Sequence, residues 1–352
     1  MTKLLMSGNE AMAEGAIRAG CRLYAGYPIT PQNEFPAYMA RHMPAAGGVF
    51  IQAESELAAI NMVFGAALTG ERAMTSSSSP GISLKQEGIS YLAGAELPAV
   101  IVNVMRGGPG LGNISPAQSD YFQATKGGGH GDYHCLVLAP ATVQESFSFM
   151  SEAFNLSDKY RNPVLVLTDG LLGQMMEPLD TRYAIRTTQY EKKWALTGCA
   201  GRRPNIIRSL YLGEGALERV NLNIQKKYKV IRDKEQRWEE FLTKDAHIIL
   251  VAYGTMARIA KSAVKQLRAK GKKIGLIRPI TLWPFPVKAF KRNTQSAQRR
   301  NTYLTIEMSC GQMVEDVCLA VNGKAKVEFL GRSGGGIPSE EEIISKVKRL
   351  VR

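Results

Sequence analysis

Two acids, Glu54 and Glu56, follow the short apolar stretch 49–52 and open an alanine-rich segment with a helical pattern. A carboxylate near a helix N-terminus is stabilised by the helix dipole, so either acid could simply stabilise the helix end. If one of them points into an apolar interface instead, burial raises its pKa. Such a carboxyl can hydrogen-bond a heterocyclic ring and move a proton. The residues alone leave both roles open.

Arg106 follows the most apolar predicted strand, residues 99–105, and precedes the glycine-rich run 107–112. Glycines let a ligand approach the backbone closely, although a single glycine-rich loop is a weak signal. A guanidinium at the end of a strand could form two hydrogen bonds with a carboxylate. A surface arginine beside a flexible loop is the alternative.

Thr30 lies between Pro28 and Pro31 in the run 26–31, which follows the short strand 23–25. Prolines three residues apart cannot both lie in a regular helix or in a central strand, so the run is predicted to be a turn from a strand to a helix. Ligands of parallel α/β sheets bind outside the carboxyl ends of the strands, where Thr30 would lie. A threonine that caps the next helix is the alternative.

Metal-binding patterns are weak in this chain. His130 and His134 flank Asp132 in a glycine-rich loop, but their spacing matches no regular element, and we interpret them as polar loop residues. The five cysteines form no CxxC pair and no close group with histidine. This pattern indicates reduced thiols and no iron–sulfur or zinc motif.

Apolar segments that alternate with helical patterns position these candidate residues. The predicted strands of the first part are 23–25, 49–52, 72–75, 99–105, 136–138 and 163–168. The predicted strands of the last part are 247–252, 273–277, 302–306 and 326–330. The alternation is typical of parallel sheets. We therefore predict an α/β protein with a doubly wound domain at 1–181, a basic connector at 182–244 with one helix at 221–242, and a smaller α/β domain at 245–352.

Charge is distributed unevenly along the 352 residues. Residues 1–180 hold 10 Lys and Arg against 16 Asp and Glu, a net −6, whereas residues 181–352 hold 35 against 15, a net +20. A cationic half could bind nucleic acid, an acidic protein or a phosphorylated cofactor. The basic run 225–237 has few aromatic residues and no nucleic-acid-binding motif, so we predict no nucleic-acid partner. No stretch approaches the roughly 20 apolar residues of a membrane span, and no signal peptide is recognisable, so we predict a cytoplasmic protein.

Several motifs, taken together and in order, resemble the α subunit of the 2-oxoacid:ferredoxin oxidoreductases, most closely the group that acts on 3-methyl-2-oxobutanoate or 2-oxoglutarate. The motifs are residues 26–31, 55–56, 75–81, 106–109, 130–132, 252–255, 276–286 and 307–313. The resemblance covers most of the chain except the connector. It implies that the first domain binds the pyrimidine of thiamine diphosphate and that the second is a transketolase C-terminal-like domain.

The resemblance also implies a reaction and a site. The family oxidatively decarboxylates 2-oxoacids to acyl-CoA and CO₂ on thiamine diphosphate, with CoA as co-substrate, and passes the electrons to ferredoxin. Glu56, chosen over Glu54 because it follows a serine, would face N1′ of the aminopyrimidine and favour the tautomer whose 4′ nitrogen deprotonates C2. Thr30 and Arg106 would contact the carboxylate end of the substrate. Other residues implied to contact the cofactor are Tyr27, Pro28, Ile29, Gly107 and Gly108.

The chain lacks a good match to the metal-binding motif of thiamine enzymes, and this lack implies partner subunits. Thiamine enzymes hold the diphosphate through a metal bound by a Gly-Asp-Gly motif, and Thr168-Asp169-Gly170 is a poor match to it. The resemblance therefore implies no metal ligands in this chain, a β subunit with the Mg²⁺ and diphosphate site, and iron–sulfur clusters only in partner subunits, among them γ and a ferredoxin-like δ. The basic half could dock acidic ferredoxin-like partners or the phosphates of CoA.

The substrate pocket departs from that of the 2-oxoglutarate enzymes of this family. Many of them have Ser-Thr at the positions of Gly110 and Leu111, and Gly at the position of Ser79. The loss of two hydroxyl groups and the gain of a leucine suit a less polar substrate, with 3-methyl-2-oxobutanoate as first choice and 2-oxoglutarate or an arylglyoxylate as alternatives. A free-standing transketolase-like enzyme, or a non-catalytic basic scaffold or nucleic-acid-binding protein, is the competing interpretation.

Overall fold

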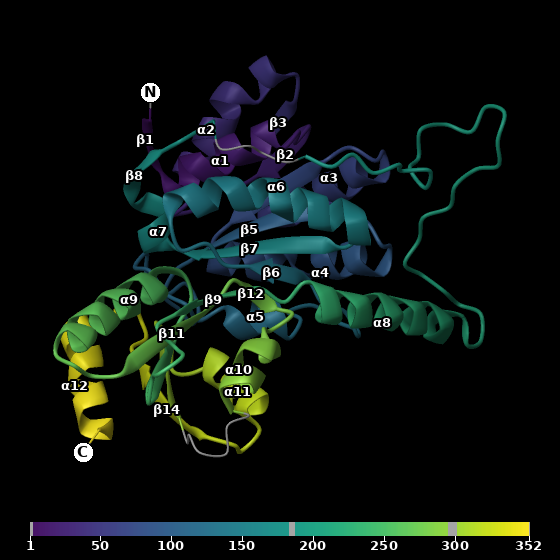
Figure 1. Cartoon of the computed structure of the whole chain (residues 1–352). Helices are drawn as coiled ribbons and strands as arrows, with labels where there is room; N and C mark the ends of the chain where they lie inside the picture. The colour runs from purple at the N-terminus through teal and green to yellow at the C-terminus, as the bar shows by residue number, and fades with distance from the viewer. Residues whose placement is uncertain (1–2, 183–186, 295–300, 352) are drawn as a thin grey trace.

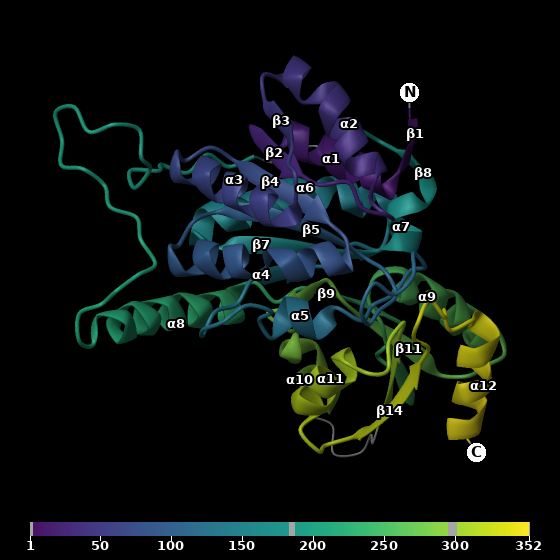
Figure 2. The same ribbon diagram turned by 180° about the vertical axis from the view of Figure 1, so that it is seen from behind.

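The computed structural model describes residues 3–182, 187–294 and 301–351. Two α/β units lie one above the other, and Figure 1 shows the larger first unit above the smaller second one. Helices cover both faces of the larger sheet, with α6 in front of it in Figure 1 and with α3 and α4 in front of it in the reverse view of Figure 2.

Within the described residues, seven strands form the sheet of the first unit. In spatial order they are β12 (Thr281–Trp283), β6 (Leu136–Leu138), β7 (Pro163–Asp169), β5 (Ala99–Met105), β4 (Ala73–Ser77), β2 (Leu23–Gly26) and β3 (Val49–Gln52). All neighbours pair in parallel except β12, which is antiparallel to β6. Because β2, β4 and β5 are parallel, their carboxyl ends meet at one edge of the sheet.

The predicted doubly wound sheet is confirmed, with one addition. All six predicted strands of the first part are present within about two residues. The seventh strand, β12, comes from the last third of the chain, and no strand was predicted at residues 281–283. Thr281 on β12 is fully buried and accepts a hydrogen bond from the backbone N–H of Arg237 at 2.9 Å, so a tertiary contact rather than a local pattern holds β12 in place.

Several helices of the first unit begin at polar residues whose side chains cap their N-termini. Ser7 and Glu10 form a capping box on α1, Ser55 caps α3 and Thr142 caps α6. The helices of this unit, in chain order, are α1 (Gly8–Arg18), α2 (Glu34–His42), the 3₁₀ turn η1 (Pro44–Ala46), α3 (Glu56–Leu68), α4 (Ser79–Gly94), α5 (Tyr121–Thr125), α6 (Val143–Tyr160) and α7 (Gly170–Gln174). A small antiparallel pair, β1 (Leu4–Ser7) and β8 (Met176–Leu179), lies beside α1 and α6.

The second unit contains the five-stranded sheet β14-β13-β10-β11-β9 among the described residues. Its strands are β9 (Trp238–Phe241), β10 (Ile248–Val251), β11 (Ile274–Pro279), β13 (Thr302–Glu307) and β14 (Lys326–Gly331). Its helices are α9 (Gly254–Ala269), α10 (Val287–Thr294), α11 (Met313–Val321) and α12 (Glu340–Leu350). The four predicted strands of this part are confirmed, and the antiparallel edge strand β9 adds a fifth.

The connector helix predicted over 221–242 is wrong at both ends. The observed helix α8 spans Ala216–Lys234, and the chain then enters β9. Glu235 accounts for the end of α8 at Lys234, because its buried carboxylate accepts hydrogen bonds from Lys159 at 2.8 Å and Tyr160 at 2.6 Å. The division of the chain at residues 181 and 244 stays a prediction, since β12 joins the sheet of the first unit.

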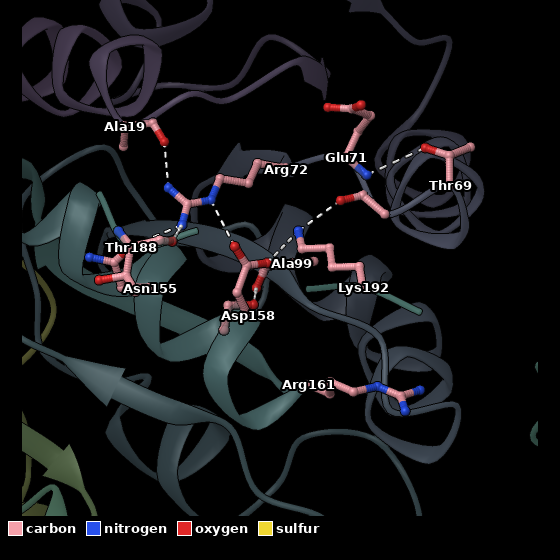
Figure 3. Close-up of polar contacts among 12 residues, drawn as sticks. Ala19, Thr69, Glu71, Arg72, Ala99, Asn155, Asp158, Arg161, Thr188 and Lys192 are labelled. Atoms are coloured by element: carbon pink, nitrogen blue, oxygen red, sulfur yellow. Dashed lines mark hydrogen bonds and ion pairs between the residues drawn. The ribbon is translucent and has the colours of Figure 1, made fainter. Parts of the chain in front are cut away.

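A partly buried ion-pair cluster, drawn in Figure 3, connects the start of the connector to the first unit. The Asp158 carboxylate pairs with Arg72 at 2.8 Å and with Lys192 at 2.6 Å. Arg72 also donates to the backbone carbonyls of Ala19 and Thr188. The cluster therefore ties α1, α6 and the connector to one another, which fits its position at the edge of the sheet distant from the strand carboxyl ends.

Helices long and apolar enough to cross a membrane are absent from the part of the chain that the structure describes.

Candidate active site

Three loops at the carboxyl ends of parallel strands surround the predicted site. The proline-rich loop 26–31 leaves β2, the serine run 76–79 connects β4 to α4, and the glycine-rich loop 107–112 leaves β5. The N-terminus of α3 follows β3, which is parallel to β2, and so lies at the same edge. The fold therefore brings together the three segments that the sequence singled out.

Glu56 is the first residue of α3 and is buried, with 6% of its surface exposed, whereas Glu54 is exposed. Ser55 caps the helix by accepting a hydrogen bond from the Ala58 N–H at 3.2 Å, so the capping role belongs to the serine. No hydrogen bond from the described residues reaches the Glu56 carboxylate. The burial of Glu56 agrees with its choice over Glu54.

The first turn of α4 lies directly against this carboxyl group. A Cβ atom on Gly81 would lie 2.5 Å from Oε1 of Glu56 and would overlap Oγ of Ser77. The hydroxyls of Thr75, Ser77 and Ser78 are buried and have no partner among the described residues. Unpaired buried polar groups are rare in native proteins, so these hydroxyls suit a polar ligand bound beside the Glu56 carboxyl.

Substitution of Gly81 by alanine is expected to abolish the close approach of α4 to Glu56. We expect the Gly81→Ala variant to bind the cofactor that the resemblance implies, thiamine diphosphate, at least about tenfold more weakly, because the added methyl group displaces the carboxyl. Calorimetric titration measures the change. Gly94→Ala in the same helix is the matched control, because a Cβ atom there would lie 3.6 Å from its nearest neighbour, Ser209. An unchanged affinity of the Gly81→Ala variant would contradict the close contact between Gly81 and Glu56.

Arg106 is buried, and its guanidinium joins two of the loops. It donates to the Thr30 carbonyl at 2.9 Å and to the Leu111 carbonyl at 3.0 Å. Nε is buried and has no partner among the described residues. Two of the five N–H donors are thus used within the protein, and a fork of donors is left for a carboxylate.

The predicted contact residues of the proline-rich loop are partly exposed. Tyr27 and Pro28 are exposed, and Ile29 and Thr30 are half-buried. The Thr30 hydroxyl accepts a hydrogen bond from Asn33 at 3.3 Å. Asn9, from α1, holds the loop from behind by donating to the Pro31 carbonyl at 2.9 Å.

The glycine-rich loop folds back on itself. Gly107 donates its N–H to the Ser115 carbonyl at 2.9 Å, and the Asn113 N–H donates to the Gly107 carbonyl at 2.9 Å. Gly107 is buried and Gly108 half-buried, whereas Leu111 is 81% exposed. Leu111 therefore accepts a hydrogen bond from Arg106 at its carbonyl and presents its apolar side chain to solvent.

Asp120 was not identified from the sequence. It accepts hydrogen bonds from Ser79 at 2.6 Å and Asn103 at 2.9 Å, and burial raises the pKa of its carboxyl. Ser79 also accepts the Arg106 N–H at 3.0 Å. No local pattern marks Asp120, because its partners lie on β5 and at the start of α4.

Lys85 was also missed, although the sequence held a signal for it. It lies at a helical spacing with Ile82, Ile89 and Leu92, the buried stripe of α4, and is itself fully buried. Its Nζ donates to the Glu56 carbonyl at 3.2 Å. Burial lowers the pKa of Lys85 to about 8, and the Glu56 charge acts in the opposite direction.

Asp169 has a structural role. It caps α7 by accepting from the N–H groups of Leu171 and Leu172, both at 3.1 Å, and accepts from the Thr255 hydroxyl at 2.8 Å. Burial raises the pKa of its carboxyl. The residues 168–170 therefore serve as a helix cap that links the two units.

The two loop histidines lie in different surroundings. His130 is exposed, whereas the ring of His134 stacks on Trp283 at 4.5 Å, and burial lowers its pKa. No group of three or more His, Cys, Asp or Glu among the described residues could hold a metal ion.

Two protein-family models match the chain. Residues 14–236 match the thiamine-diphosphate-binding model of the pyruvate flavodoxin/ferredoxin oxidoreductases, and residues 246–343 match core domain II of pyruvate:ferredoxin oxidoreductase. The first match covers more than half of the chain.

Similar curated proteins are subunits of related enzymes. The chain is 50% identical over 352 residues to the ketoisovalerate oxidoreductase subunit VorB of Methanothermobacter marburgensis, covering 99% of this chain and 98% of that protein. It is 37% identical over 377 residues to the 2-oxoglutarate synthase subunit KorA of Methanothermobacter thermautotrophicus, with the same coverages.

Two solved structures share the fold. The 2-oxoglutarate:ferredoxin oxidoreductase of Magnetococcus marinus, solved with 2-oxoglutarate, coenzyme A and succinyl-CoA bound, matches with a TM-score of 0.88 at 28% identity. The match covers 99% of this chain and 65% of that chain, so the present chain spans slightly less than two thirds of its length. A split-gene transketolase in an inactive tetrameric form matches with a TM-score of 0.60 at 12% identity, which shows the fold alone.

Proposed function

The chain belongs to the 2-oxoacid:ferredoxin oxidoreductase family, and from that premise we propose that it is the subunit that supplies the pyrimidine side of a shared thiamine diphosphate site. The assembled enzyme converts a 2-oxoacid, CoA and two oxidised ferredoxins to acyl-CoA, CO₂, a proton and two reduced ferredoxins. The observation that carries the proposal is the buried Glu56 carboxyl, which no described donor reaches.

When bound, thiamine diphosphate supplies the nucleophilic carbon that attacks the 2-oxo group and accepts the electrons released on decarboxylation. Glu56 holds the aminopyrimidine ring by a hydrogen bond to a ring nitrogen and moves a proton at that atom. Gly81 leaves room for the carboxyl, and Tyr27, Pro28 and Ile29, together with Gly107 and Gly108, would contact the ring.

Arg106 and Thr30 are proposed to bind the carboxylate end of the 2-oxoacid. The unpartnered Nε of Arg106 and its remaining N–H donors suit a carboxylate. The bonds of Arg106 to the two loop carbonyls fix the guanidinium before the substrate arrives, which reduces the entropy lost on binding.

The subunit that completes the site is proposed to cover α3. This helix is apolar on nearly every side, a pattern typical of a buried helix, yet Leu57 is 47% exposed and Asn61 is exposed. Other large apolar side chains are exposed on elements around the site, namely Tyr27, Leu84, Leu111 and Ile114. We propose that a β subunit with the Mg²⁺ and diphosphate site binds here and that γ and ferredoxin-like δ subunits carry the iron–sulfur clusters.

The experiment that tests this proposal is calorimetric titration of thiamine diphosphate with Mg²⁺ into this chain, into its partner and into the assembled enzyme. Tight binding is expected only in the assembled enzyme, since each chain contributes part of the site. Equal affinity of this chain alone would contradict the shared site.

The substrate is proposed to be a branched-chain 2-oxoacid, first of all 3-methyl-2-oxobutanoate. The exposed Leu111 makes the loop beside Arg106 apolar, and the relative at 50% identity is a ketoisovalerate oxidoreductase subunit. The similarity to 2-oxoglutarate enzymes at 37% and 28% identity keeps 2-oxoglutarate as the alternative, followed by an arylglyoxylate. The cytoplasmic location stays a prediction.

Substitution of Leu111 by threonine tests the choice of substrate. The Leu111→Thr variant is expected to lower kcat/KM for 3-methyl-2-oxobutanoate relative to 2-oxoglutarate by about tenfold, because the pocket loses an apolar contact and gains a hydroxyl. Ile114→Thr, three residues further along the chain, is the control, because the side chain of Ile114 is also exposed. If the ratio of the two kcat/KM values is unchanged in Leu111→Thr, Leu111 does not determine the choice of substrate.

A further inference from the structure

Lys85 of α4 is fully buried, and burying a lysine costs free energy because its charge loses contact with water. Lys85 occupies a position in the apolar stripe of α4 where methionine or leucine would fill the same space without burying a charge. It is among the largest fully buried side chains of the described residues. A role beyond packing is therefore needed to account for it.

The contacts of Lys85 point to Glu56. Its Nζ donates to the Glu56 carbonyl at 3.2 Å, the one hydrogen bond of this ammonium among the described residues. The Glu56 carboxyl lies against Gly81, one helical turn before Lys85. The buried lysine thus reaches the first turn of α3.

Other charged groups near this corner have partners of their own. On α4 itself, Glu87 is exposed and accepts a hydrogen bond from Tyr91. Asp120 accepts from Ser79 and Asn103, and Arg106 donates to loop carbonyls. Glu56 is therefore the charged side chain on which Lys85 acts, from α3, the helix packed against it.

We propose that Lys85 is a positioning residue for Glu56, which holds the first turn of α3 through the Glu56 carbonyl and stabilises the carboxylate that Glu56 becomes when its proton moves to the ring nitrogen. The inference rests on the proposed role of Glu56. The proton balance is simple: the carboxyl O–H bond breaks, a ring N–H bond forms, and the reverse transfer restores both groups. A cation near the carboxylate favours the ionised state.

The direction of the pH dependence follows from the state of Lys85. Its ammonium is present below about pH 8 and is lost above that value. The turnover rate of the wild-type enzyme should therefore fall as the pH rises through this range. A variant that lacks the charge should show no such decline.

The experiment uses the assembled enzyme with Lys85→Met and Lys85→Gln. The methionine keeps the volume, and the glutamine keeps an N–H donor for the Glu56 carbonyl without the charge. Both variants are expected to lower kcat about tenfold below pH 8, to retain thiamine diphosphate affinity within about threefold, and to lose the decline above pH 8. Lys227→Met is the matched control, because Lys227 is a partly buried lysine that pairs with Glu96.

Each outcome decides between the two proposals. A wild-type complex that binds no thiamine diphosphate in calorimetry overturns the function and this inference together. A complex that binds it, with Lys85→Met and Lys85→Gln matching the wild-type pH profile, overturns only this inference. Full rescue by Lys85→Gln shows that the hydrogen bond alone matters, and it refutes the electrostatic role.

Discussion

Glu56→Gln is expected to lower acyl-CoA formation by the assembled enzyme about 10³-fold while assembly is retained. The amide is close in shape to the carboxyl, so the packing against Gly81 is preserved. The amide cannot give up a proton to the ring nitrogen, which is the role proposed for the Glu56 carboxyl. The measurement is the rate of acyl-CoA formation with saturating thiamine diphosphate, with assembly followed by gel filtration.

Glu54→Gln is the matched control for this prediction. The two acids are two positions apart, but Glu54 is exposed and Glu56 buried. The Glu54 variant should keep its activity within about twofold, since exposed substitutions rarely change function or stability. Comparable losses in both variants would mean that the net charge at the helix N-terminus matters rather than the position of one carboxyl.

Arg106→Ala is expected to reduce kcat/KM for the 2-oxoacid roughly 100-fold, mainly through a higher KM. The substitution removes the donors proposed for the substrate carboxylate, and it also frees the Thr30 and Leu111 carbonyls that Arg106 holds. Steady-state kinetics with CoA and a low-potential dye provides the measurement.

Arg106→Lys separates the two effects. Lysine keeps the positive charge but cannot present a planar fork of donors, so a partial recovery is expected. Unchanged kcat/KM in Arg106→Ala would show that the guanidinium serves only to join the two loops.

The sheets were predictable from the sequence because their strands are short apolar runs between helical patterns. Strand β5, for example, is buried at all seven positions and has only one polar residue, Asn103. Four strands were missed: β9 and β12 of the main sheets, and the small pair β1 and β8. All four are held by pairing with distant parts of the chain, β9 with β11, β12 with β6, and β1 with β8. Local patterns carry no information on such pairing.

Candidate site residues could also be selected from the sequence, and their roles stay predictions. Glu56, Arg106 and Thr30 stand out because they follow strands and adjoin prolines, glycines or a helix start. Their hydrogen bonds were not predictable, and the bonds from Arg106 to loop carbonyls were not expected. Asp120 was missed because its partners are distant in sequence, whereas Lys85 could have been noticed as a charge within an apolar helical stripe.

The most direct test of the central claim is a 2-oxoacid screen on the complex that copurifies with this chain, with a low-potential dye as electron acceptor. The account predicts dye reduction that requires both thiamine diphosphate and CoA and is fastest with 3-methyl-2-oxobutanoate. The account would be contradicted by a complex that retains bound thiamine diphosphate but fails to reduce the dye with any of the 2-oxoacids in the screen.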